Sequence, residues 1–161
     1  MHKSVYRKKP LALYLLIFLL TLQSLTALIC GASMMWEPSG VSMNLAPQLL
    51  DSSPFRSFFL PGFFLFTCLG ALPLLAVYEL LSSRGIRIFR RINFYDNYKP
   101  GWMLSLFCGF GTLIWITAQL YFTKTFHFLQ TVYATVGLLI LVMSLLPATM
   151  KYCNVVSNSD A

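Results

Sequence analysis

Eight polar or ionisable side chains lie near the ends of long apolar segments, and they are the residues with which this chain could form a site. They are Glu37, Asp51, Arg56, Gln119, Lys124, His127, Gln130 and Tyr133. The order of the segments places all eight toward one side of a membrane, where such groups are costly unless they are paired or hydrated. One interpretation is a shared outward-facing pocket. The other is that each group meets water at the end of its own helix, which requires no site.

The sequence carries no recognisable catalytic or metal-binding pattern. His127 has no second His, Cys or carboxylate at a ligand spacing. The four cysteines show no paired spacing, so we expect thiols that pack as small apolar groups. Glu37 and Asp51 share one connection, but they would have to converge to act as an acid and base pair. We therefore predict no catalytic residue, no metal and no cofactor.

Polar and small residues also recur at helical spacing within three of the apolar segments. They are Ser105, Cys108, Thr112, Trp115 and Gln119; Gln130, Tyr133 and Gly137; and Gln23, Ala27, Cys30 and Gly31. Membrane helices associate through small residues and through polar side chains that bond between helices. These stripes are therefore interpreted first as packing seams, and second as walls of the outward-facing pocket.

The elements that must position these residues are four apolar stretches at residues 11–33, 61–81, 102–122 and 126–150. Each is close to the ~20 residues that cross a ~30 Å hydrocarbon layer. The chain is 57% hydrophobic and 11% charged, whereas soluble domains have about 25% charged residues. We predict an all-α integral membrane protein, folded as a single four-helix bundle over residues 1–161.

Lys and Arg residues are distributed unequally between the two sides of the predicted bundle. Arg56 and Lys124 lie on one side. The other ten of the 12 lie on the opposite side: Lys3, Arg7, Lys8, Lys9, Arg84, Arg87, Arg90, Arg91, Lys99 and Lys151. Because basic residues mark cytoplasmic connections, both termini are predicted in the cytoplasm.

The connection at residues 34–60 holds more apolar residues than a hydrated loop would carry. We predict a short interfacial helix at Ala46–Leu50 and a second one opened by Ser53 and Pro54. Phe55, Phe58 and Phe59 are expected to face acyl chains or to cover the outer end of the bundle.

The basic connection at residues 82–99 alternates two kinds of side chain. Ile86, Ile88, Phe89 and Ile92 fall on one helical arc, and Arg84, Arg87, Arg90 and Arg91 fall on the other. An amphipathic helix that contacts anionic lipid headgroups and an ordinary basic loop both fit this pattern. The segment lacks the aromatic platforms of an RNA-binding module, so no nucleic-acid partner is expected.

Two further residues of the second apolar stretch have expected local roles. Pro73 removes a backbone hydrogen bond and is expected to kink the helix. Glu79 is expected to pair with Arg84 or Arg87.

Two sets of residues carry a resemblance to known proteins. The first is Pro38, Ser39, Gly40, Leu50, Asp51, Ser52, Ser53, Pro54, Phe55, Phe58, Pro61 and Gly62; the second is Trp115, Gln119, Leu129, Gln130, Tyr133 and Gly137. In these the chain resembles a group of small four-helix bacterial inner-membrane proteins of uncharacterised function. The resemblance implies the bundle, a bacterial inner membrane and a periplasmic 34–60 connection. It implies no activity and no catalytic residue.

Three functions are compatible with the sequence. The first is a non-enzymatic membrane protein that binds a lipid or a partner membrane protein through its periplasmic half. The second is a component of a small transporter or channel, which would need a homo-oligomer because four helices are few for a pathway. The third is a membrane enzyme that acts on a lipid substrate, with Glu37, Asp51 or His127 as the residues to test.

Overall fold

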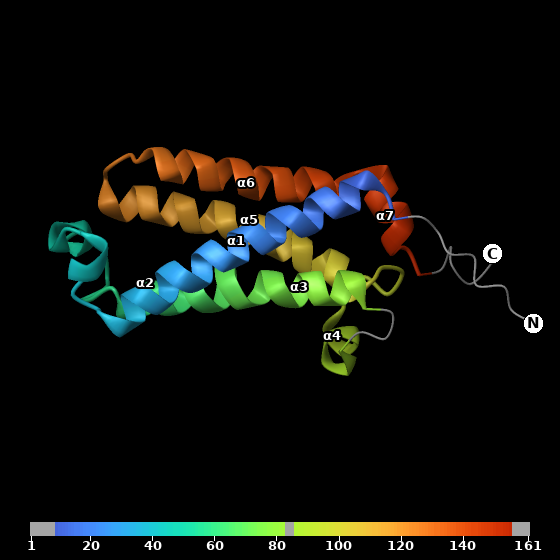
Figure 1. Cartoon of the computed structure of the whole chain (residues 1–161), viewed down its shortest axis with the longest axis horizontal. Helices are drawn as coiled ribbons and strands as arrows, with labels where there is room; N and C mark the ends of the chain where they lie inside the picture. Colours follow the sequence, from blue (N-terminus) through green and yellow to red (C-terminus); the bar gives the residue numbers. More distant parts are fainter. Residues whose placement is uncertain (1–8, 83–85, 156–161) are drawn as a thin grey trace, which may run out of the picture.

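The protein is a bundle of four long helices that run side by side (Figure 1). The computed structural model describes residues 9–82 and 86–155. The spans are α1 (Leu11–Trp36), a continuous helix formed by α2 (Phe59–Phe64), η3 (Leu65–Ala71) and α3 (Leu72–Leu81), then α5 (Pro100–Thr123) and α6 (Phe128–Leu145). Within these residues, four helices are long and apolar enough to cross a membrane, which confirms the predicted fold class.

Short elements distinguish the two ends of the bundle. The loop end carries η1 (Val41–Met43) and η2 (Pro47–Leu50) between α1 and α2. The opposite end, here called the basic end, carries α4 (Arg87–Ile92) and α7 (Pro147–Cys153) (Figure 1). Because the number of spans is even, α1 begins at the basic end and α7 lies there too.

Several boundaries differ from the sequence predictions. The first span continues to Trp36, and the second begins at Phe59. Ser53 and Pro54 do not open a helix. Instead the Ser53 hydroxyl donates to the Leu50 carbonyl at 2.9 Å and accepts the backbone N–H of Phe55 at 3.2 Å. A side chain that can bond its own backbone in this way competes with a helix start and closes a turn.

The fourth span, in contrast to the first two, is shorter than predicted, because it begins at Phe128 and ends at Leu145. Leu146 is extended, with ψ 135°, and Pro147 then starts α7 as its first residue. A proline disfavours helical backbone in the residue before it but suits the first turn of a new helix.

Pro73 lies just after a π-helical segment, Leu65–Ala71, in the second span. Proline has no backbone N–H, so one carbonyl of the preceding turn loses its helical partner. The neighbouring Gly70 carbonyl accepts the buried Ser24 hydroxyl of α1 at 2.6 Å. The change of helix type and this bond from α1 both lie next to the proline, and such features are how membrane helices tolerate proline within a span.

The half of the bundle nearest the basic end is closely packed. Its buried cluster consists of Leu13, Leu16, Leu20, Ala76, Leu80, Trp102, Met103, Leu104, Cys108, Ile140 and Cys153. Trp102 is central, because its indole N–H donates to the Ser144 carbonyl at 2.8 Å and its ring stacks on Tyr98 at 4.4 Å. The backbone N–H of Lys99 donates to the Cys153 carbonyl at 2.8 Å, which ties α5 to α7.

Glu79 of α3 is buried at the basic end, with 2% of its surface exposed. Its carboxylate accepts the backbone N–H of Ile86, which precedes α4. Arg84, one predicted partner, lies outside the described residues, and the other, Arg87, has an exposed side chain. The carboxylate therefore holds the start of α4 through backbone rather than through Arg87.

Candidate functional site at the loop end

The half of the bundle nearest the loop end is hollow. A cavity of about 390 Å³, here called the larger cavity, lies between the second span and α5. Contacts between these two helices are concentrated on α3, so they diverge toward the loop end. The volume falls within the ~300–1,000 Å³ of small-molecule sites.

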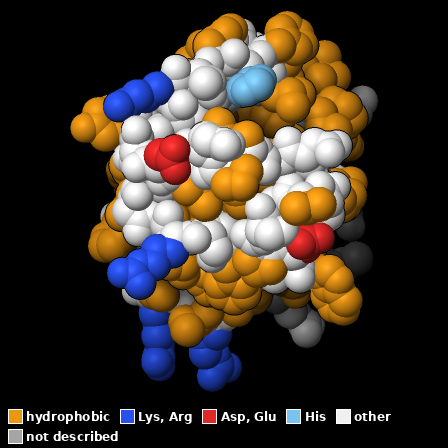
Figure 2. Space-filling view, turned by 90° about the vertical axis from the view of Figure 1, so that its left-hand side faces the viewer, with side chains coloured by type: hydrophobic (Ala, Val, Ile, Leu, Met, Phe, Trp, Pro, Cys, Tyr) orange, Lys and Arg blue, Asp and Glu red, His pale blue; other side chains and the backbone are white. Residues whose placement is uncertain are grey.

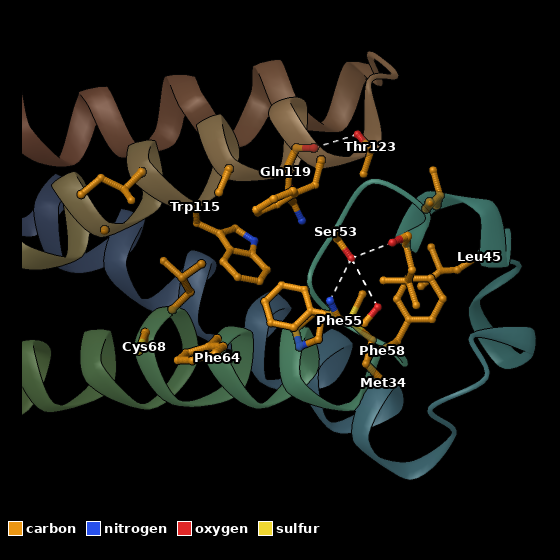
Figure 3. A pocket seen from close by; sticks show the side chains of 18 residues that line it. Met34, Leu45, Ser53, Phe55, Phe58, Phe64, Cys68, Trp115, Gln119 and Thr123 are labelled. Atoms are coloured by element: carbon orange, nitrogen blue, oxygen red, sulfur yellow. Dashed lines mark hydrogen bonds between the residues drawn. The ribbon is translucent and has the colours of Figure 1, made fainter.

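The connection between α1 and α2 covers the larger cavity at the loop end. Figure 3 shows Phe55 from this connection and Trp115 from α5 pointing into the same space. The Phe55 ring meets Phe122 edge to face, with centroids 6.3 Å apart. Phe58 is 6% exposed, and its N–H donates to the Pro38 carbonyl at 3.0 Å. These contacts fix the loop over the cavity, as part of its wall.

The larger cavity also opens sideways, through the face between the second span and α5. Three of its lining residues on these helices have exposed side chains, namely Phe64, Cys68 and Ile114, the last 69% exposed. These positions lie within the apolar spans. The opening therefore faces the hydrocarbon layer in a membrane-inserted bundle.

The lining of the larger cavity is almost wholly apolar. Ser53, Gln119 and Thr123 supply its polar side chains, along with the indole N–H of Trp115. Thr123 bonds the Gln119 carbonyl of its own helix at 2.8 Å. None of the described lining residues carries a charge, so the cavity suits hydrocarbon.

A smaller cavity of about 180 Å³ adjoins the larger one, between α1, η3, α5 and α6. Met34, Leu69, Trp115 and Gln119 line both cavities. The smaller cavity is more polar, because Gln23, Thr26, Thr112, Gln119, Gln130 and Tyr133 all line it.

The eight predicted site residues divide between this hollow and the surface. Gln119, Gln130 and Tyr133 line the smaller cavity, and Gln119 also lines the larger one. The other five line neither cavity: Glu37, Asp51, Arg56, Lys124 and His127. Of these, Glu37 accepts a hydrogen bond from the nearby Ser39 hydroxyl and the other four side chains are exposed. In Figure 2, which faces the loop end, the acidic groups in view lie apart from each other.

The polar stripe of the third span changes role along its length. Ser105 and Cys108 are fully buried where the helices pack closely, and Thr112, which is 1% exposed, lies where this packing meets the smaller cavity. Trp115 and Gln119, one and two turns further on, line the cavities. The two interpretations of this stripe, a seam and a pocket wall, thus describe its two halves.

The structure also gives the cavity residues that the sequence reasoning did not place in a site. Leu45, Leu49, Leu50, Phe55 and Phe58 of the connection line the larger cavity. The high apolar content of residues 34–60 indicated that these side chains are buried. It did not indicate which helices they pack against.

At the basic end, the structure has a short helix, α4, in the connection for which an amphipathic helix and an ordinary basic loop both fitted the sequence. Phe89 packs on the core, whereas Ile88 and Ile92 are 59% and 50% exposed. Arg87 and Arg91 have exposed side chains. Arg84 and the side chain of Arg90 lie outside the described residues.

The four cysteines give a chemical test of this arrangement. Cys68 lines the larger cavity and Cys30 the smaller, whereas Cys108 and Cys153 are fully buried at the closely packed end. The pKa of the Cys153 thiol is raised to about 11, because the effect of burial exceeds the opposite effect of the nearby positive charge of Lys99. Only the thiolate reacts readily, so a raised pKa means less reactive thiol at any given pH.

We expect N-ethylmaleimide to modify Cys68 and then Cys30 in the folded protein at pH 7.5, and to leave Cys108 and Cys153 unmodified up to about pH 9. Peptide mass spectrometry measures each site, and the denatured protein is the control in which all four react. Modification of Cys153 as fast as Cys68 would contradict the closely packed basic end.

Comparisons of the chain with models of protein families, with curated proteins and with solved structures found no match.

Proposed function

We propose that this protein binds a hydrocarbon chain of a membrane lipid in the larger cavity. The observation that carries the proposal is an apolar cavity of about 390 Å³ that lies at the depth of the spans and opens sideways between two of them. A ligand enters such a site from the bilayer, without crossing water. Lipid chains are the most abundant molecules at that depth.

Packing supplies the selectivity for a bound chain over the surrounding lipid. Moving a chain from bilayer to protein gains no hydrophobic free energy, because lipid tails are as apolar as leucine. The gain comes from close contact with a fixed wall, such as that formed by Phe55, Phe58 and Trp115. With no charged lining residue among those described, a charged headgroup would stay outside the cavity.

The proposed setting is a bacterial inner membrane with the loop end in the periplasm and both termini in the cytoplasm. The ten-to-two distribution of Lys and Arg supports this orientation. The exposed Arg87 and Arg91 then face the cytoplasmic leaflet, where they contact anionic headgroups.

Reporter fusions are expected to show this orientation. A periplasm-active reporter should give signal when fused after Asp51 and none when fused after Val155, and a cytoplasm-active reporter should give the reverse. Periplasmic signal from the fusion after Val155 would contradict the orientation.

Photo-crosslinking with a phospholipid that carries a diazirine in its acyl chain tests the binding proposal. We expect labelling to concentrate on Phe64, Cys68 and Ile114, at the mouth of the cavity. Leu138 and Val142 of α6 are the control, because they are 54% and 44% exposed and line neither cavity. Equal labelling of both groups would show only the surrounding lipid and would overturn the proposal.

A further inference from the structure

The smaller cavity contains a buried hydrogen-bond acceptor that has no partner. Gln23 of α1 is 2% exposed and lines this cavity. Its Nε2 donates to the Thr112 hydroxyl at 2.7 Å, whereas its Oε1 has no hydrogen-bond partner within residues 9–82 and 86–155. Leaving a buried polar atom unpaired costs about 1–3 kcal/mol, so such an atom calls for an explanation.

The neighbouring bonds fix which atom of the Gln23 amide is unpaired. The Thr112 hydroxyl donates its hydrogen to the Cys108 carbonyl at 2.8 Å, so toward Gln23 it can only accept. The amide therefore presents its nitrogen to Thr112 and keeps its oxygen free. The free group is an acceptor, and its partner must donate.

A free donor lines the same cavity. Gln130 of α6 is 8% exposed, and its Oε1 accepts the backbone N–H of His127 at 3.0 Å. This leaves the Gln130 Nε2, which has no hydrogen-bond partner among the described residues, as a donor on a residue that lines the cavity, as Tyr133 also does. A hydroxyl group both donates and accepts, so it matches a lining that offers a Gln oxygen and a Gln nitrogen.

The absence of charge in the described lining, and the residues shared with the larger cavity, limit the chemical class of the ligand further. None of the described residues that line the smaller cavity is charged, so a phosphate, carboxylate or ammonium would be buried without a counter-ion. Trp115 and Gln119 line both cavities, so the two cavities adjoin. A molecule with an apolar chain and an uncharged hydroxyl group therefore matches the pair of cavities.

We infer that the smaller cavity is a site for the uncharged hydroxyl group of a lipid, with Gln23 as the acceptor that recognises it. This rests on the proposed function, because the lipid's chain occupies the larger cavity. The ligand class is a neutral lipid with a free hydroxyl, such as a long-chain alcohol or a monoacylglycerol. Gln23 provides specificity for the hydroxyl, and the larger cavity provides binding for the chain.

The test is protection of Cys30 and Cys68 from N-ethylmaleimide in mild detergent, where no phospholipid layer covers the thiols, with 1-hexadecanol or hexadecane as the probe. Cys30 reports on the smaller cavity and Cys68 on the larger. In the wild-type protein we expect hexadecanol to slow modification of both cysteines. Hexadecane is expected to slow modification of Cys68 more than that of Cys30.

Gln23→Leu removes the acceptor while keeping a side chain of similar length. It should raise the hexadecanol concentration that half-protects Cys30 by about five- to tenfold, the effect of one hydrogen bond. Hexadecane protection should not weaken. Thr112→Val is the matched control, because it deletes the same bond between α1 and α5 but keeps the Gln23 oxygen, and it should retain the preference for the alcohol.

Three results would overturn the inference. If hexadecanol protects Cys68 but not Cys30, the smaller cavity holds only water, and the proposed function still stands. If Gln23→Leu and Thr112→Val weaken protection equally, Gln23 acts only through helix packing. If neither probe protects either cysteine, the inference and the proposed function both fail.

Discussion

Gly111→Phe is expected to abolish chain binding in the larger cavity while the bundle remains folded. Gly111 lines this cavity from α5, and an added Cβ would meet no atom of the described residues within 4 Å, apart from its chain neighbours and its own helix backbone. The phenyl ring therefore has open space to enter, and it takes volume that the lipid chain would use. Labelling of Cys68 and Ile114 by the diazirine lipid should fall to the level of Leu138 and Val142 on α6, which is the level set by the surrounding lipid.

Gly111→Ala is the control for this variant. It adds one methyl group in the same open space, so labelling should stay within about twofold of wild type. The labelling of Leu138 and Val142 on α6 should be unchanged in both variants, since it reports on the surrounding lipid. Unchanged labelling of Cys68 in a folded Gly111→Phe protein would contradict chain binding in the cavity.

Gly31→Ala is expected to have the largest effect on stability. Gly31 of α1 lies against backbone of the second span, and an added Cβ would be 2.7 Å from both the Gly62 oxygen and the Phe66 nitrogen. Backbone cannot move aside as a flexible side chain can, so the two helices must separate. We expect a loss near the upper end of the 1–3 kcal/mol typical of overpacking. For a chain of this size that lowers Tm by about 6–12 °C.

The stability comparison again uses Gly111→Ala, the same substitution at a helix position with open space around it. Its Tm should be equal to or slightly above that of wild type, because alanine is the better helix former. A thermal shift assay in mild detergent measures all three proteins. Equal Tm values for Gly31→Ala and wild type would mean that α1 and α2 are not in close contact.

The spans were predictable from sequence because length and composition determine what can cross a bilayer. The exact residues at which the helices begin and end were harder to predict. Trp36 and Phe59 extend their helices beyond the expected limits, since an apolar connection gives no sharp change in composition. By contrast, α6 ends at Leu145 for a reason visible in the sequence, because Leu146 precedes a proline and leaves the helical conformation.

The sequence indicated the end of the bundle at which the candidate site lies, but not which residues line the site. Spacing alone placed Thr112, Trp115 and Gln119 on one face of α5. It could not show the point along the bundle at which α5 and the second span diverge, because that point depends on contacts between residues far apart in the sequence. Thr112 is buried against Gln23 of α1, whereas Gln119 meets open space.

The hydrogen bonds within the smaller cavity were likewise beyond sequence reasoning. Gln23 was recognised as part of a polar stripe, but its unpaired oxygen depends on which way the Thr112 hydroxyl points. His127 and Gln130 were expected to share a pocket; the structure instead uses the Gln130 oxygen to bond the His127 backbone. Their roles follow from local geometry at the start of α6.

Native mass spectrometry of the protein, extracted gently from its host membrane, tests lipid binding in the larger cavity most directly. The activation energy should be set to remove the loosely bound surrounding lipid. The proposal predicts that wild type and Gly111→Ala each keep one lipid per chain at that energy, and that Gly111→Phe keeps none. A wild-type protein that carries no lipid, or one whose lipid content matches that of Gly111→Phe, would contradict it.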